Sequence, residues 1–195
     1  LQVRGTGLVA EGALRRATLV REVEAEVEID GAVAALWCDG PLEATLRGET
    51  LRVVAQGAVH LAAKDLALRC DRLEILLPDA KRARHAAARA IVDAAGSVRA
   101  DSPRGWTLEA PRVVLEGDRA AIEGPLRLEG SGRLRLFGEG ERRVRLDAGS
   151  ASLLLARAGL EEPAWLECEL LGGVAAAADD GGALAAARVV LEPDR

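Results

Sequence analysis

The sequence predicts an all-β fold built from repetitive antiparallel strands, with little helix. Three segments, at 57–79, 96–118 and 172–194, share one pattern. Each opens with Gly-x-Val, passes through a variable stretch to an L-x-(A/C) step, and closes with an aspartate after an apolar alternation. The apolar residues recur with a period of two, which is the period of a strand with one apolar face. A recurring unit of this size is typical of a repetitive architecture.

The first strand is expected over 23–29. There valine, alanine and isoleucine alternate with glutamate in the run EVEAEVEID (22–30), and Gly31 follows it. Side chains on a strand point alternately to its two faces. We therefore expect one apolar face and an acidic outer row.

Two fainter copies of the unit begin at Gly40 and Gly124. The copy at Gly40 reads as two short strands, with a hairpin turn at GETL (48–51). The copy at Gly124 has a similar turn signal at GSGR (130–133), and Leu134 and Leu136 then take the places of Trp106 and Leu108. Because the copies start at uneven intervals, the sequence predicts recurring strand pairs and not a strict solenoid.

The clearest copy, at 96–118, also indicates where its strand bends. The apolar parity changes at Pro111, between Ala110 and Val113. Proline cannot donate to a strand ladder, so it suits a bulge or bend. Asp79, Asp118 and Asp194 each stand in a turn context.

The segment AKRARHAAARAIVDAA (80–95) departs from the strand pattern. Alanine and arginine favour helix, and Asp79 is a suitable cap. The competing interpretation makes Ala90–Ala94 the strand that precedes Gly96. We expect a loop or helical turn over Lys81–Arg89, followed by that strand.

Composition is consistent with a single domain spanning 1–195, long enough for a substantial core. The net charge of −5 argues against nucleic acid as a partner. No run of apolar residues is long enough for a membrane-spanning helix. The chain begins at Leu1, which is typical of a domain excised from a larger protein, so the lack of a visible signal peptide carries no information.

Residues that carry chemistry are few, and the sequence predicts neither an enzyme, a cofactor nor a metal site. His60 and His85 have no cysteine or carboxylate at a metal-ligand spacing. Asp179 and Asp180 precede Gly181 and read as a hairpin turn, while Glu161 and Glu162 read as a solvated loop. An enzyme whose site is assembled from several strands is the remaining alternative in this class.

The cysteines and the basic clusters have structural interpretations. Cys70 takes the apolar position that Ala110 and Ala186 hold in other copies, which favours a buried thiol. A disulfide between two of Cys38, Cys70 and Cys168 is the alternative in an oxidising compartment. The basic groups are expected on exposed surfaces, with contact to anionic headgroups as the alternative: Lys81, Arg82, Arg84 and Arg89, and then Arg142, Arg143 and Arg145.

The segments RVVAQGAVHL (52–61) and LALRCDRLEI (66–75) resemble the OstA-like family, which includes the LptA-type lipopolysaccharide-transport proteins. The segments IVDAAGSVRA (91–100) and LEAPRVVLEG (108–117) resemble it too. The resemblance is good over 40–118, looser through the copy at Gly172, and poor over 139–171. It implies an elongated, open β-jellyroll of the cell envelope or periplasm, active in outer-membrane biogenesis. Such domains hold acyl chains in an apolar groove and pair with similar domains through their edge strands.

On this resemblance the partners are lipopolysaccharide or another acylated lipid, and neighbouring β-jellyroll domains. The function implied is a lipid-binding or bridging domain without catalysis. The alternatives are a closed core, and a structural β-module of an envelope assembly that acts by edge-strand pairing. The candidate groove residues are the inward-facing Val59, Leu68, Ile75, Val98, Trp106, Leu108, Val113, Leu115, Leu134 and Leu136.

Overall fold

The computed structural model describes residues 2–11, 16–29, 32–63, 66–78, 89–102, 105–132, 142–155 and 165–191. Within these ranges the chain is all-β and contains no helix. The strands are β1 (Gln2–Glu11), β2 (Arg16–Ile29), β3 (Ala32–Cys38), β4 (Leu42–Arg47), β5 (Thr50–Ala63), β6 (Leu66–Pro78), β7 (Ile91–Asp101), β8 (Thr107–Glu116), β9 (Arg119–Glu123), β10 (Leu126–Gly132), β11 (Arg142–Ala148), β12 (Ser150–Leu155), β13 (Trp165–Ala178) and β14 (Ala183–Leu191).

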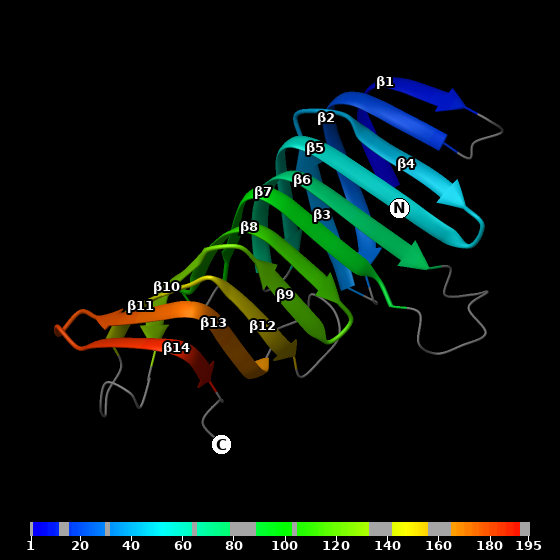
Figure 1. Cartoon of the computed structure of the whole chain (residues 1–195). Coiled ribbons are helices and arrows are strands. Elements are labelled where there is room, and N and C mark those ends of the chain that lie inside the picture. The colour runs from blue at the N-terminus through cyan, green and yellow to red at the C-terminus, as the bar shows by residue number, and fades with distance from the viewer. Residues whose placement is uncertain are drawn as a thin grey trace.

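All fourteen strands belong to one antiparallel sheet, which is folded over on itself and does not close into a barrel. They follow one another along a single axis, from β1 at one end to β14 at the other (Figure 1). The long strands β2, β5, β6, β7, β8, β13 and β14 bend midway and run through both halves of the fold. The first half-sheet also contains the short strands β4, β9 and β12, and the second contains β3, β10 and β11. This is the elongated, open antiparallel architecture that the sequence predicts.

The bend of each long strand, which we call the corner, explains the Gly-x-Val motif. The residue pairs Gly57–Ala58, Gly96–Ser97 and Gly172–Gly173 all have positive φ, between 43° and 81°. At each pair the ladder to the next strand shifts register, because the bent strand carries an extra residue. Glycine adopts this left-handed conformation without the clash that a Cβ atom causes. The motif therefore marks a bulge inside a strand.

Where two successive short strands lie on opposite half-sheets, the glycine that joins them at the corner contacts one of these bulges. Gly40 lies between β3 and β4, and its N–H donates to the carbonyl oxygen of Gln56 at 3.0 Å. The Asp39 N–H donates to the carbonyl oxygen of Gly57, also at 3.0 Å. A Cβ on Gly40 would lie 2.4 Å from the Gln56 oxygen, so the two backbones approach too closely for any side chain. Gly149 and Gly172 repeat this approach further along the corner.

Most of the expected elements in the described ranges are confirmed. β2 ends at Ile29, and its buried residues alternate with exposed glutamates. The hairpin turn at Gly48–Glu49 joins β4 to β5. Asp118 lies in the turn between β8 and β9. Pro111 lies at the corner of β8. The strand before Gly96 is present as β7. The expected loop over 81–88 and the turns at Asp79 and Asp194 lie outside the described residues.

The hairpin turn predicted at GSGR is wrong over 130–132. These residues continue β10 and pair with β11, with Gly130 opposite Val144 and Ser131 opposite Arg143. The physical reason is the Trp106 ring, which covers Gly130 on the inner face, so that a Cβ there would lie 2.3 Å from the indole. Glycine at 130 makes room for a neighbouring side chain and not for a turn.

Candidate functional site

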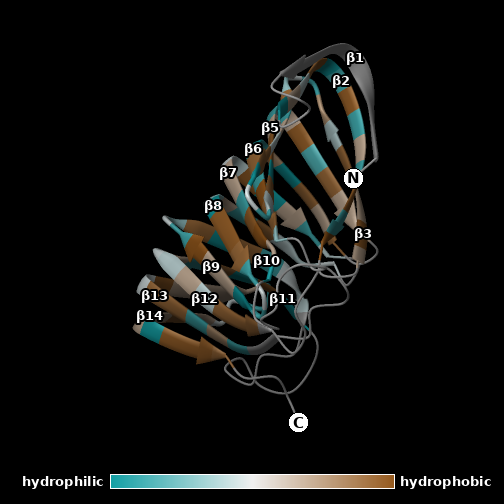
Figure 2. Cartoon of the chain, turned by 90° about the vertical axis from the view of Figure 1, so that its right-hand side faces the viewer, coloured by the Kyte–Doolittle hydropathy of each residue, from teal (hydrophilic) through white to brown (hydrophobic). Residues whose placement is uncertain are grey.

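The space between the two half-sheets, here called the interior, is the best candidate for a functional site. Its walls are aliphatic, because inward-facing positions on both half-sheets are almost all valine, leucine, isoleucine or alanine. Figure 2 shows hydrophobic and hydrophilic residues following one another along the strands. No polar or charged residue is buried among the described ones. Two core clusters fill the interior, one over β2–β7 and one over β8–β14. Such walls suit apolar contacts and offer no group for acid, base or metal chemistry.

The side of the interior opposite the corner, where the strands end, is here called the mouth. On β5, β6 and β8 burial falls from the corner toward the mouth, whereas on β2 Ile29 at the mouth is still buried. On β5, Val59 next to the corner is fully buried, while Ala63 at the mouth is partly exposed. On β6, Ile75 is fully buried and Leu77 is partly exposed. In β8 the partial exposure extends to Val113, two residues from the corner proline. The wall that β8 forms is therefore less covered than those of β5 and β6.

The structure places the described residues of the predicted groove along the interior but does not gather them in one cluster. Val59, Leu68, Ile75 and Val98 have exposed fractions of 6% or less and belong to the first cluster. A ligand at these four positions would have to displace core packing. The remaining described positions, Trp106, Leu108, Val113 and Leu115, are all partly exposed, and Leu134 and Leu136 lie outside the described residues.

Sequence reasoning missed most of the second cluster. The walls of this cluster come largely from β10 to β14. Much of that region lies within 139–171, where the sequence matches the repeated strand pattern poorly. The alternation in RRVRLDA (142–148) is the sequence signal that predicts a strand with an inward face here. The structure agrees with it, since Val144 and Leu146 face inward and are 1% exposed. The inward residues that add to the predicted set are Leu126, Leu128, Val144, Leu146, Ala151, Leu153, Leu170, Val174, Leu184, Val189 and Leu191.

The polar residues considered for chemistry form no site in the described ranges. His60 is exposed on the outer face of β5, as the strand parity predicts. Asp179 and Asp180 form the predicted hairpin turn between β13 and β14, where Asp180 accepts a hydrogen bond from the Gly182 N–H at 3.1 Å. No group of three or more metal-ligating side chains occurs in the described part of the chain. Arg89 pairs with Asp118 at 3.3 Å.

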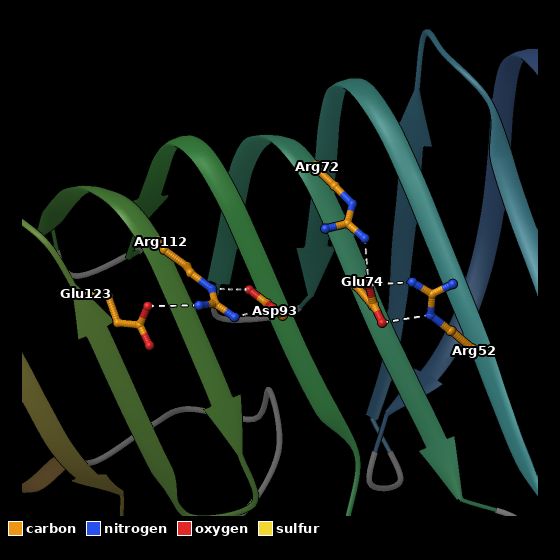
Figure 3. Close-up of polar contacts among 6 residues, drawn as sticks. All are labelled: Arg52, Arg72, Glu74, Asp93, Arg112 and Glu123. Atoms are coloured by element: carbon orange, nitrogen blue, oxygen red, sulfur yellow. Dashed lines mark hydrogen bonds and ion pairs between the residues drawn. The ribbon is translucent and has the colours of Figure 1, made fainter.

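Arginine–carboxylate pairs cross the outer face of the first half-sheet (Figure 3). Arg52 makes a two-pronged contact with Glu74, at 2.7 and 2.8 Å. Arg112 lies between Asp93 at 2.7 Å and Glu123 at 2.9 Å. Hydrogen bonds from Arg52 and Arg112 lower the pKa of Glu74 and of Asp93 respectively. These carboxylates are held ionised across strands, so they fix register and are poor proton carriers.

Substitution of Asp93 with asparagine is expected to give a pH-dependent loss of stability. Because the pKa of Asp93 is lowered in the folded state, its pair with Arg112 stabilises the fold above the unfolded pKa, and that stabilisation is lost as pH falls through the folded pKa. We expect a loss of about 0.5–1 kcal/mol at pH 7, the range for partly exposed pairs. Urea unfolding at pH 7 and pH 3 measures it, and the difference from wild type should shrink at pH 3. Glu116→Gln, at an exposed carboxylate, is the control; an equal loss there would contradict the pairing.

The outer face of the second half-sheet carries a polar hollow of about 450 Å³ between β8, β10 and β11. Its charged groups are already paired: Arg99 contacts Glu109 at 3.3 Å, and Arg127 contacts Asp147 at 3.0 Å. The third lining arginine, Arg143, lies 4.0 Å from Glu129, so each arginine of the hollow has a carboxylate partner.

All three cysteines are free and buried on the inner face, and Cys38 and Cys70 lie next to the corner. The disulfide that the sequence offered as an alternative is absent. Cys70 is buried as a small side chain of the core, which confirms the prediction. Burial raises the pKa of Cys70 and of Cys168 to about 11, and it also raises that of Cys38. A raised pKa keeps these thiols protonated at neutral pH, so they are weak nucleophiles.

We expect Cys38, Cys70 and Cys168 to resist a thiol reagent such as Ellman's reagent at pH 8 while the protein is folded. The thiolate fraction is small there and the sulfur atoms are covered. In denaturant all three should react at the rate of free cysteine, which serves as the control. A thiol that reacts at that rate in native buffer would show that its part of the interior is open.

No helix able to cross a membrane is found in the part of the chain that the structure describes. Comparison of the chain with family models, with curated proteins and with solved structures gives no match.

Proposed function

We propose that this domain holds the acyl chains of a lipid in its interior and carries or bridges them without catalysis. The observation that supports it is a mostly aliphatic interior whose mouth-side residues on β5, β6 and β8 are partly exposed, in a sheet that does not close. The OstA-like resemblance of the sequence points the same way. It suggests a periplasmic or envelope setting, with lipopolysaccharide or another acylated lipid as cargo.

The proposed ligand position is the β8–β14 part of the interior. There Leu108, Leu128 and Leu184 are only partly buried, whereas Val59 and Ile75 are fully enclosed. Each methylene removed from water contributes roughly 0.8 kcal/mol. A chain of about twelve carbons then gains about 10 kcal/mol before the cost of ordering the ligand and the walls. Binding of this kind needs no particular polar residue.

Quenching of tryptophan fluorescence by a brominated fatty acid tests the proposal. Trp106 lies on the inner face against Gly130, while Trp37 is exposed on the outer face. A variant that keeps only Trp106 (Trp37→Phe, Trp165→Phe) should be quenched in a saturable way. The matched variant that keeps only Trp37 should not be.

A second substitution tests the site itself. Leu184→Glu places a charge at a partly exposed position of the interior and should weaken quenching of Trp106 at least tenfold. Equal quenching of Trp37 and Trp106, or no effect of Leu184→Glu, would contradict a ligand between the half-sheets.

The edges of the sheet favour a second candidate, a structural β-module. Among the described strands, β1 pairs with β2 alone and β14 with β13 alone, and both follow the bend through the two half-sheets. Each therefore presents an unpaired edge to another strand. End-to-end oligomers that grow with concentration in lipid-free protein, and that Ala185→Lys on β14 prevents, would favour this function over lipid carriage.

A further inference from the structure

The outer face of β3 carries an exposed apolar stripe, formed by Val33, Ala35 and Trp37. Alternation along β3 places these three outward, while Ala34 and Leu36 are buried in the interior. Val33 is 65% exposed and Trp37 is 42% exposed. Two large apolar side chains four residues apart on one strand lie on the same face. With the partly exposed Ala35 between them, they form one apolar row on the outer face of β3.

An acidic row runs beside this stripe on β2. Glu24, Glu26 and Glu28 stand opposite Trp37, Ala35 and Val33 in the ladder, and all three glutamates are exposed. No ion pair joins these glutamates to a described residue.

The positions that the described ladders set beside this row and its stripe carry few basic residues. On β1, Arg4 is in register with Glu24, but Gln2 is opposite Glu26. On the other side of the stripe, β5 places His60 opposite Trp37 and Ala62 opposite Ala35.

The outer face further along the same half-sheet is different. On β7, β8, β10 and β11 the outward charges pair with one another, as Arg127 does with Asp147 and Arg99 with Glu109. Charge there is balanced within the chain. Beside the β3 stripe, no described residue forms an ion pair with Glu26 or Glu28, so their negative charge is available to a partner.

We propose that the β3 stripe and its acidic row form a docking site for a basic amphipathic helix of a partner protein. β3 is hydrogen-bonded to β2 and to β5, so no strand can add to it and binding has to use side chains. The stripe is one strand wide and about 14 Å long, which matches about nine residues of helix. The helix lays its apolar face on Val33 and Trp37, with lysine or arginine along the flank above β2. This site is independent of the interior and of its proposed ligand.

A designed peptide probes the site directly. It is an 18-residue fluorescein-labelled helix with leucine on one face, lysine along one flank of that face and glutamine elsewhere, titrated with the full chain by anisotropy. We expect saturable binding that weakens as salt rises, because the pairs lie on the surface. The variant Val33→Thr/Trp37→Thr should bind at least tenfold more weakly, since exposed aromatic anchors dominate such contacts.

A charge swap separates this site from general attraction to an acidic protein. Glu26→Lys/Glu28→Lys should weaken binding about tenfold and should create binding of a matched peptide with glutamate in place of lysine. The control Glu49→Lys/Glu116→Lys makes the same change in net charge at exposed positions away from β3 and should bind like wild type. Far-ultraviolet circular dichroism confirms that each variant is folded.

Three results would overturn the proposal. The first is equal loss in the control variant, which indicates nonspecific attraction. The second is unchanged binding to Val33→Thr/Trp37→Thr. The third is self-association of the wild-type chain that this double substitution abolishes, which would make a second copy the occupant of the stripe.

Discussion

Replacement of Gly40 with alanine is expected to lower the free energy of unfolding by about 3 kcal/mol, the upper range for a forced overpacking. The new Cβ would lie 2.4 Å from the carbonyl oxygen of Gln56 and 3.1 Å from its carbon. These are backbone atoms, so no side-chain rotation relieves the contact. The corner has to open, which strains the hydrogen bonds from Asp39 and Gly40 to β5. Urea unfolding followed by circular dichroism measures the change.

Gly48→Ala is the matched control for this substitution. Gly48 lies in the hairpin turn between β4 and β5 at φ +61°, and no atom lies within 4 Å of its would-be Cβ. Its cost is the left-handed backbone alone, about 1 kcal/mol. If both variants lose the same stability, the close approach of Gly40 to β5 is not what constrains the corner.

The sequence predicts the strand pattern well because a period of two follows directly from the geometry of a single strand. It does not show what the Gly-x-Val motif does. A turn and a bulge within a strand both require positive φ, and both favour glycine. Gly57 and Gly96 lie in bulges and not in turns because β5 and β7 continue to pair with β6 and β8 on both sides of the bend. Only the pairing of distant segments reveals that the motif is a corner.

The interior over β10–β14 could not be predicted for a related reason. Gly130 resembles a turn residue, yet it is required by the Trp106 ring packed against it. β11 and β12 are short strands on opposite half-sheets, joined through Gly149 at the corner. In sequence they lack the long alternation that makes β5 or β6 recognisable.

The sequence also leaves open whether inward aliphatic residues form a core or line a groove. Both require the same side chains on the same face. The difference lies in how closely the two half-sheets approach, which depends on contacts between residues far apart in the chain. Ile75 is the sharpest case, because it was predicted as a groove residue and its exposed fraction is 0%.

Ile75→Ala is therefore expected to lower the free energy of unfolding by about 3–4 kcal/mol, as for truncation of a fully enclosed side chain. Leu77→Ala is the matched control on the same strand and face, at the partly exposed mouth, where about 1–2 kcal/mol is expected because less area is buried. Urea unfolding of both variants, with and without a saturating fatty acid, measures the losses. A core role for Ile75 predicts a large loss of stability with ligand affinity unchanged. If Ile75→Ala instead keeps its stability and loses affinity, the half-sheets separate around the ligand at this position, and the groove extends into the β2–β7 part of the interior.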